Sequence, residues 1–265
     1  MNIFLHEVKI YRKSTIIWTV SLILVVGFFM SLYPAIAHDA AQFKKLLEGY
    51  PEAVRKAVGV SIDSITSLLG FYSYVFMYIV LCGSIQAMNL GLSIIAKEVQ
   101  EKTADFLFTK PVTRTAIMTA KLLAAFCSLL ITNVIYSVAA SIIATKVSKE
   151  AVDMKVFLLI TVTAFFVELM FMALGVIVAV IARKIKAVLP LSLSIVFGFF
   201  ILNMFGSIIG EKAIRYLTPF KYYDTAYIIK HSSYESIFII IEVLFIITAI
   251  AASYLIYTKK DIHAV

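Results

Sequence analysis

Long apolar runs separated by short polar segments make up most of this chain. Each of the longest runs exceeds the roughly eighteen consecutive apolar residues that indicate a membrane-spanning helix. A bilayer leaves the backbone few alternatives, because every peptide group within the span must be hydrogen-bonded internally. The pattern therefore predicts an all-α polytopic membrane protein with six transmembrane helices, at about Ser14–Ala37, Leu68–Ala96, Thr115–Thr145, Val156–Ile181, Ala187–Ile209 and Ile237–Tyr257.

Lys and Arg residues between the apolar runs predict how these helices are oriented. An even number of spans places both termini on the same side of the membrane. The segments on that side carry their basic residues in short stretches, whereas the basic residues on the other side are nearly balanced by acidic ones. Both termini are therefore predicted to be cytoplasmic, since basic residues are concentrated in short cytoplasmic segments.

The polar segments predict the smaller features of the molecule. No linker, low-complexity tract or internal repeat divides the chain, so residues 1–265 are predicted to form a single transmembrane domain. Residues 38–67 and 210–236 are predicted to be outer loops. Pro51 suits the first turn of a helix, so a short helix is expected in the first of these loops.

Residues 1–13 predict a helix of their own. At about 100° per residue, Phe4, Val8 and Tyr11 share one face, and the opposite face is basic. Such a segment is typical of an interfacial helix that lies on the inner leaflet before the first span; a disordered tail is the alternative. The basic start and the small residues Ala35–Ala37 also resemble a signal peptide, but the apolar run is longer than a usual signal core, so an uncleaved span is expected.

Composition narrows the possible functions. The chain is 62% hydrophobic and 15% charged, with a formal net charge of +8, which is typical of a membrane protein whose loops face anionic lipid. No basic stripe with interleaved aromatic residues outside the spans indicates nucleic-acid binding. Cys82 and Cys127 lie within apolar runs and are expected to be small buried hydrophobes, not a disulfide or a metal pair.

Sequence signatures of catalysis are absent. The chain contains no phosphate-binding G-x-x-x-x-G-K-[ST], no zinc-binding H-E-x-x-H and no G-x-S-x-G nucleophile motif. All four histidines lie outside the predicted spans. A chain without recognisable catalytic or metal-binding residues is expected to be a transport component, and a membrane enzyme is disfavoured.

The segment 97–114 is unusual because it carries acidic as well as basic residues between two apolar runs. As a helix it places Val99 and Phe106 on one face and Glu98 and Asp105 on the other, and Pro111 ends it. Acidic residues at the inner surface face anionic lipid, which is mildly unfavourable, so a partner protein would account for them. By periodicity alone, a solvated face without a partner is an equally good explanation.

The stretch "KEVQEKTADFLFTKPVTRTAIMTAKLLA" resembles the segment after the second span in permease subunits of type-2 ABC transporters. The matching positions are Glu98, Glu101, Thr103, Leu107, Pro111, Thr113, Arg114 and Lys121, whereas Lys102 stands where that family usually has a glycine. The resemblance extends to "RYLTPFKYYDT" with its pair Pro219 and Phe220, to the amphipathic start, which resembles the family's elbow helix, and to the closing "YTKKDI".

This resemblance implies a mechanism. Two permease subunits, identical or different, form the translocation path in the plasma membrane and export a cargo. Two copies of a separate ABC ATPase hold ATP and Mg²⁺ and dock below, and the segment after the second span is the coupling helix that contacts them. The positions that the resemblance assigns to ATPase coupling are Glu98, Glu101, Lys102, Asp105, Phe106, Leu107, Pro111 and Arg114.

Four polar residues within the spans are candidates for the translocation path: Asn133, Glu168, Asn203 and Glu242. A charged residue at the bilayer centre costs roughly 2.5–3.5 kcal/mol, so Glu168, near the middle of the fourth span, must be protonated, paired or in contact with water. It is either a cargo or ion site, or a protonated carboxyl that joins helices. The structural role is favoured for Glu242, and both asparagines suit interhelical hydrogen bonds.

Two further features bear on these candidates. A secondary transporter driven by an ion gradient, with Glu168 as its ion site, is the alternative function, although the inverted repeats typical of that class are not evident. Gly83, Ala87 and Gly91 form a stripe of small residues on one helix face, which predicts close approach of another helix.

Overall fold

The computed structural model describes residues 3–62, 64–100, 113–148, 151–182, 185–209 and 212–259. Helices account for nearly all of this described part, and no strand occurs within it. In chain order the elements are α1 (Ile3–His38), α2 (Ala40–Glu48), α3 (Glu52–Ala57), α4 (Leu68–Gln100), α6 (Arg114–Val147), α7 (Met154–Ile181), α8 (Val188–Ile209), α9 (Lys212–Leu217), the 3₁₀ helix η1 (Pro219–Lys221), α10 (Thr225–His231) and α11 (Ser236–Lys259).

Six of these helices are long and apolar enough to cross a membrane: α1, α4, α6, α7, α8 and α11. They coincide with the six predicted spans, with ends that agree within a few residues except at the start of α1 and the end of α4. The predicted fold class, an all-α protein with six membrane-spanning helices, is therefore confirmed.

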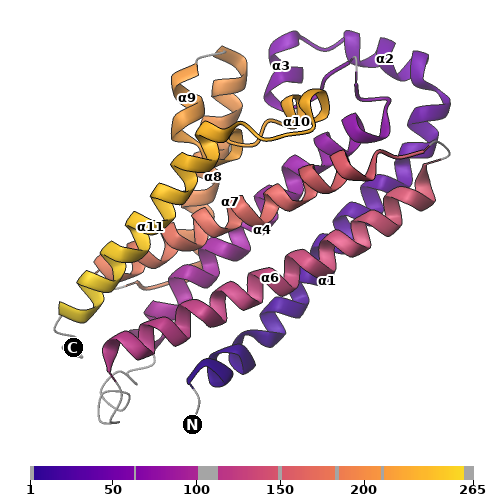
Figure 1. Cartoon of the computed structure of the whole chain (residues 1–265). Helices are drawn as coiled ribbons and strands as arrows, with labels where there is room; N and C mark the ends of the chain where they lie inside the picture. Colours follow the sequence, from indigo (N-terminus) through magenta and orange to yellow (C-terminus); the bar gives the residue numbers. More distant parts are fainter. Residues whose placement is uncertain are drawn as a thin grey trace.

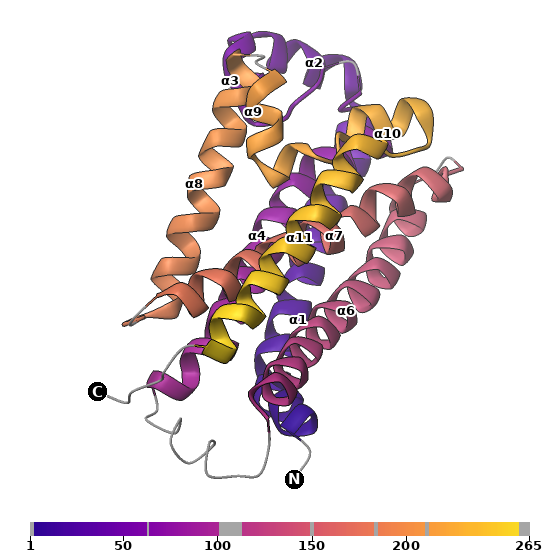
Figure 2. The same ribbon diagram turned by 60° about the vertical axis from the view of Figure 1, so that its left-hand side comes forward.

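The bundle has two ends (Figures 1 and 2). Both chain termini lie at one end, where α4 also ends and α6 begins; we call this the termini end. The short helices α2, α3, α9 and α10 lie at the other, which we call the loop end. The segments predicted to share a side of the membrane are thus found at the same end of the bundle.

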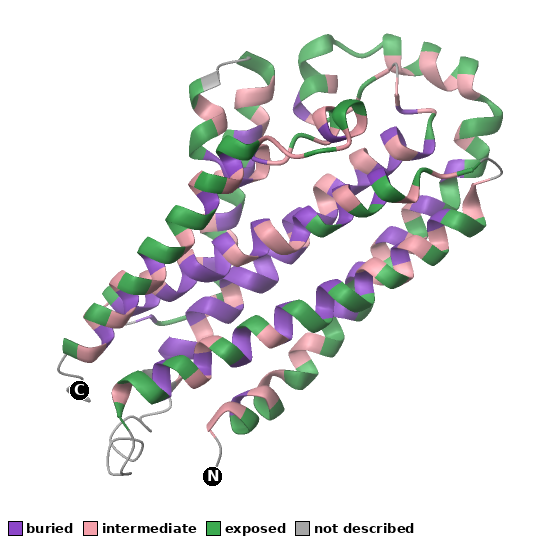
Figure 3. Ribbon diagram, viewed as in Figure 1, coloured by how far each residue is buried: buried purple, intermediate pink, exposed green. Residues whose placement is uncertain are grey.

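Helices α4 and α7 form the centre of the bundle, and buried positions concentrate on them (Figure 3). Their backbones touch where Gly91 of α4 meets Gly175 of α7. A Cβ atom on Gly91 would lie 2.3 Å from the Met172 carbonyl oxygen, and one on Gly175 would lie 2.8 Å from the Met88 carbonyl oxygen. The predicted role of the small-residue stripe, close approach of a second helix, is confirmed.

The first residues of the chain differ from the prediction. They are helical, and Phe4, Val8 and Tyr11 pack against the core as their shared face predicted. However, α1 runs from Ile3 to His38 without interruption, so residues 3–13 are not a separate interfacial element. The physical reason is that neither Pro nor Gly separates this segment from the span, and the Thr15 hydroxyl donates to the Tyr11 carbonyl across the predicted boundary at 3.1 Å.

The loop end is more ordered than the sequence indicated. Pro51 directly precedes α3, so the short helix expected there is confirmed. Helix α2 in the same segment was not predicted, and neither were α9, η1 and α10 within residues 210–236. These short helices have few residues each, so periodicity could not distinguish them from loops.

Candidate functional site

A buried ionic cluster joins three helices at the termini end. The Glu7 Oε1 atom of α1 lies 3.5 Å from the Lys121 Nζ atom of α6, and its Oε2 atom lies 3.6 Å from the Lys97 Nζ atom of α4. Lys121 has no exposed surface, and its ammonium also donates to the Ile94 carbonyl at 2.5 Å. Burial of these charges is tolerated because each has an opposite charge or a hydrogen bond nearby.

Glu7 was missed in the sequence analysis, although a signal was present. It lies next to Tyr11 at the edge of the face shared by Phe4, Val8 and Tyr11, and it is the only acidic residue among the first thirteen. An acidic side chain on a buried face requires a basic partner. Lys97 and Lys121, which flank the polar segment after α4, are those partners.

The residues assigned to ATPase coupling lie mostly outside the described part of the chain. This holds for Glu101, Lys102, Asp105, Phe106, Leu107 and Pro111, and for the side chain of Glu98 in the last turn of α4. Arg114 is described, and its guanidinium donates to the Thr258 carbonyl near the end of α11 at 3.3 Å. The Thr113 hydroxyl accepts from the Ala116 backbone N–H and caps α6. The coupling role stays a prediction.

Two path candidates meet in the middle of the bundle. Asn133 of α6 donates to the Glu168 Oε2 atom of α7 at 2.6 Å, and Glu168 is only 1% exposed. Its Oε1 atom lies directly above Gly83 of α4, where a Cβ atom would come within 2.1 Å of it. The pair therefore links α6 to α7 next to Gly83 of α4, which fits the predicted role of Glu168 as a carboxyl that joins helices. A role in a translocation path stays a prediction.

Further buried hydrogen bonds connect the same helices. The Gln86 amide of α4 and the Thr19 hydroxyl of α1 both donate to the Thr132 hydroxyl of α6, at 3.0 and 3.1 Å. The Tyr72 hydroxyl of α4 bonds to the hydroxyls of Tyr136 and Thr161, at 3.0 and 2.8 Å. The contacts of Gln86 with Thr132 and of Tyr72 with Tyr136 join α4 to α6, and so connect the α1–α6 pair to the α4–α7 pair.

Glu242 lies in α11 near the loop end. Its Oε2 atom accepts a hydrogen bond from the Tyr223 hydroxyl, and the side chain is 4% exposed. Burial, and then this hydrogen bond, raise the pKa of Tyr223, so the phenol stays neutral and acts as a donor. Such a contact between α11 and the connection that precedes it fits the structural role favoured for Glu242.

A cavity of about 260 Å³ lies between α4, α7, α8 and the segments at the loop end. The described residues that line it include the path candidate Asn203, but not Asn133, Glu168 or Glu242. Asn203 is 4% exposed, and its Oδ1 atom has no hydrogen-bond partner in the described structure. The four path candidates thus lie in three separate places: Asn133 pairs with Glu168, Glu242 bonds to Tyr223, and Asn203 alone of the four lines the cavity.

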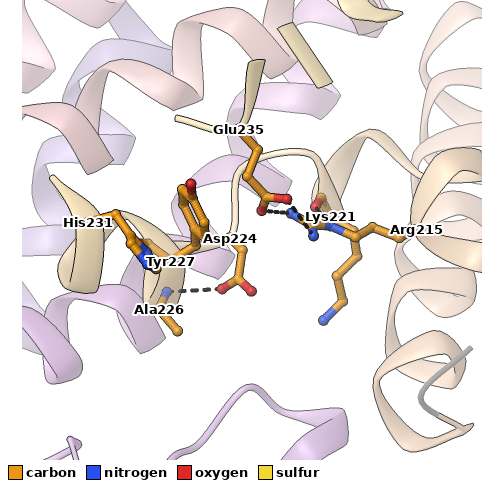
Figure 4. A network of polar contacts seen from close by, with 7 residues as sticks. All are labelled: Arg215, Lys221, Asp224, Ala226, Tyr227, His231 and Glu235. Atoms are coloured by element: carbon orange, nitrogen blue, oxygen red, sulfur yellow. Dashed lines mark hydrogen bonds and ion pairs between the residues drawn. The ribbon is translucent and has the colours of Figure 1, made fainter. Parts of the chain in front are cut away.

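Five residues of the segment "RYLTPFKYYDT" line this cavity: Phe220, Lys221, Tyr223, Asp224 and Thr225. Figure 4 shows polar contacts of this segment. The guanidinium of Arg215 forms an ion pair with the Glu235 carboxylate, and its Nε donates to the Lys221 carbonyl at 3.0 Å. The Asp224 carboxylate accepts from the Ala226 backbone N–H at 2.9 Å and caps α10. Lys221 and Asp224 themselves line the cavity, so this segment brings two charged groups to it.

The described part of the chain thus contains six helices long and apolar enough to cross a membrane, joined by buried polar pairs, with a cavity near the loop end. A family model described as ABC-2 family transporter protein matches residues 1–262. The chain therefore belongs to the ABC-2 family of transporter proteins, as its sequence motifs indicated. A comparison with curated proteins finds no match.

Family membership bears on whether the chain is part of an ABC transporter or a secondary transporter. Members are membrane components of ABC transporters and not their ATPases, which favours a permease over a secondary transporter driven by an ion gradient.

Proposed function

We propose that the chain is the permease subunit of an ABC exporter, which forms the translocation path and couples to separate ATPase subunits. The observation that carries this proposal is the family match over residues 1–262, which covers all six membrane-spanning helices. A second permease subunit, identical or different, would complete the path. Two ATPase copies would hold ATP and Mg²⁺.

The proposed contact with the ATPase is the segment after α4. Its acidic residues Glu98, Glu101 and Asp105 would face the ATPase, and Phe106 and Leu107 would anchor the segment to the membrane domain. The described helices on either side support this role, because both are tied into the bundle. Glu7 binds Lys97 and Lys121, and Arg114 binds the end of α11. A displacement of the segment would therefore reach α1, α4, α6 and α11 together.

The proposed location is the plasma membrane, with the termini end in the cytoplasm. The dense basic residues of the short segments at this end support that orientation. Cysteines placed at Glu52 and at Lys102 test it, since only the first should react with an impermeant thiol reagent added to intact cells. Reaction at Lys102 would reverse the orientation.

Charge reversal tests the docking contact. A charge-assisted contact contributes about 1.5–3 kcal/mol, but solvent screening reduces an exposed pair to below about 1 kcal/mol, so a single substitution is a weak test. The triple variant Glu98→Lys, Glu101→Lys and Asp105→Lys should insert normally but lose the ATPase during purification.

A matched control reverses three exposed acidic residues at the loop end: Asp39, Glu48 and Glu52. It makes the same change in net charge, and the ATPase should stay bound. If both triple variants retain the ATPase and support transport, the segment after α4 is not the docking contact.

A further inference from the structure

The cavity at the loop end is built for a molecule with a polar and an apolar part. Val80 and Val167 line it farthest along α4 and α7, about 18–20 Å from the starts of these helices at a rise of about 1.5 Å per residue. Phe76 and Met77 add apolar surface on the same side. Its charged residues come instead from the connection between α9 and α10, outside the membrane-spanning helices.

Lys221 supplies a positive charge to the cavity, with the exposed Asp224 carboxylate as a nearby opposite charge. It is half-buried, and its ammonium forms no hydrogen bond or ion pair within the described residues. The neighbouring Arg215 is already paired with Glu235, and Figure 4 shows the Lys221 side chain extending away from that pair. Burial lowers the pKa of Lys221, the nearby Asp224 carboxylate offsets part of this effect, and Arg215 adds to it. A negative group in the cavity would compensate this charge.

Asn203 supplies a buried acceptor without a partner. Its Oδ1 atom has no hydrogen bond within the described part of the chain, although the residue is 96% buried. Buried polar atoms are nearly always satisfied, so such an atom at a cavity wall indicates a donor supplied from the cavity. Asn203 and Lys221 line the same cavity, so one ligand that spans it would meet both residues.

Asp224 limits the charge that this space can accept. It is exposed and lines the cavity, and only its Oδ1 atom is used in capping α10. Its negative charge beside Lys221 disfavours groups with more than one negative charge.

We propose that this cavity binds an amphipathic molecule whose head group joins a single negative charge to a hydrogen-bond donor. Lys221 faces the negative charge, Asn203 accepts from the donor, and the apolar surface of α4 and α7 holds the hydrocarbon part. A phosphodiester with neighbouring hydroxyl groups has this chemistry. The inference concerns binding alone and does not depend on coupling to an ATPase.

Three lipids separate the contributions of charge and donor. Phosphatidylglycerol carries one negative charge and hydroxyl donors, phosphatidylmethanol carries the same charge without a donor, and phosphatidylcholine carries neither a net charge nor a donor. Native mass spectrometry of the purified chain, titrated with each lipid, gives an apparent Kd. Phosphatidylglycerol should bind about fivefold more tightly than phosphatidylmethanol and at least about tenfold more tightly than phosphatidylcholine. Equal binding of all three would overturn the proposal.

Variants assign each contribution to a residue. Lys221→Met should weaken phosphatidylglycerol binding about tenfold, and the control Lys230→Met, an exposed lysine of α10 outside the cavity lining, should leave it unchanged. Asn203→Leu should remove the preference for phosphatidylglycerol over phosphatidylmethanol. If the leucine variant does not fold, the comparison of phosphatidylglycerol with phosphatidylmethanol on the unaltered protein still tests whether the cavity recognises a hydrogen-bond donor. An unchanged Kd in Lys221→Met overturns the proposal.

A soluble head group distinguishes a lipid-like ligand from a small polar one. Glycerophosphoglycerol has the same charge and hydroxyl groups as phosphatidylglycerol but no acyl chains. It should fail to displace the lipid at comparable concentrations, because it cannot use the apolar surface. Displacement at equal concentration would overturn the amphipathic class of ligand.

The pH dependence gives a readout specific to Lys221. Binding requires the ammonium, whose pKa lies below the ordinary 10.5. As the pH is raised, the affinity for phosphatidylglycerol should therefore begin to fall before pH 10.5 is reached. The other groups that face Lys221 are the Asp224 carboxylate, the Arg215 guanidinium, which is paired with Glu235, and the phenol of Tyr223, whose pKa is raised by burial and by its hydrogen bond to Glu242. Lys221→Arg should therefore keep its affinity at a pH where the unaltered protein loses it. An identical profile in both proteins would contradict the assignment.

Discussion

Substitution of Glu7 by Gln tests whether the ionic cluster at the termini end holds α1 to α4 and α6. The amide keeps the shape of the carboxylate but removes the negative charge. Lys121, which has no exposed surface, then loses the negative charge of Glu7, and so does Lys97, whose side chain is 19% exposed. Removal of one partner from a buried ion pair typically costs about 3–5 kcal/mol, because the other charge is left uncompensated.

The structure indicates the lower end of this range. The two nitrogen–oxygen distances, 3.5 and 3.6 Å, are longer than a hydrogen bond, and Lys121 keeps its bond to the Ile94 carbonyl in the variant. We therefore expect Glu7→Gln to lower the free energy of unfolding by about 3 kcal/mol. Reversible unfolding in mixed micelles of dodecyl maltoside and SDS, followed by circular dichroism, measures this change.

A double variant separates the ion pair from a general effect on α1. Lys121→Met in the Glu7→Gln background removes the buried positive charge that faced Glu7 and should restore most of the lost stability. The control Glu48→Gln makes the same chemical change at an exposed position of α2 and should have no measurable effect. If Glu7→Gln is as stable as the unaltered protein, or if the stability losses of Glu7→Gln and Lys121→Met simply add in the double variant, the ionic cluster does not hold α1 to α4 and α6.

Three further substitutions test other parts of the bundle. Gly91→Val should prevent folding or lower the free energy of unfolding by more than about 3 kcal/mol, because the added atoms meet a backbone carbonyl of α7; a stably folded variant, detected by size-exclusion chromatography, would contradict the packing. Glu168→Gln can still bond to Asn133, so stability should change by less than about 1 kcal/mol; altered transport together with unchanged stability would assign Glu168 to the path, and unchanged transport would assign it to helix packing. Tyr223→Phe leaves the buried Glu242 carboxyl without its hydrogen bond and should cost about 1–3 kcal/mol in the same unfolding assay; equal stability would remove the structural role of that contact.

The sequence predicted the membrane-spanning helices well, because span length is set by the bilayer and each apolar run is bounded by charged residues. It also predicted that Gly91 lies at a close helix contact, because small residues on one helix face let the backbone of a second helix approach closely. Periodicity cannot, however, show which faces of different helices meet. The pairing of Asn133 with Glu168, and of Glu7 with Lys121, depends on packing between distant parts of the chain.

The candidate site was predicted less well for a related reason. Asn203 was identified as a polar residue within a span, but the sequence did not indicate that Lys221 would line the same cavity. That juxtaposition arises from the short helices at the loop end, which are too short to leave a periodic pattern. The residues assigned to coupling were identified by resemblance to a family, and most of them lie outside the described residues.

The contact between Gly91 and Gly175 has a consequence for the genetics of this protein. In each direction the atom that a new Cβ would meet is a backbone oxygen, of Met172 or of Met88. A backbone oxygen is present whatever residue occupies the position, so no smaller side chain elsewhere can make room for a substitution at either glycine. Neither glycine can compensate for a change in the other, because no residue is smaller. A search for second-site suppressors of Gly91→Val should therefore recover reversion to glycine at position 91, but no compensating replacement at Met172, Gly175 or Met88.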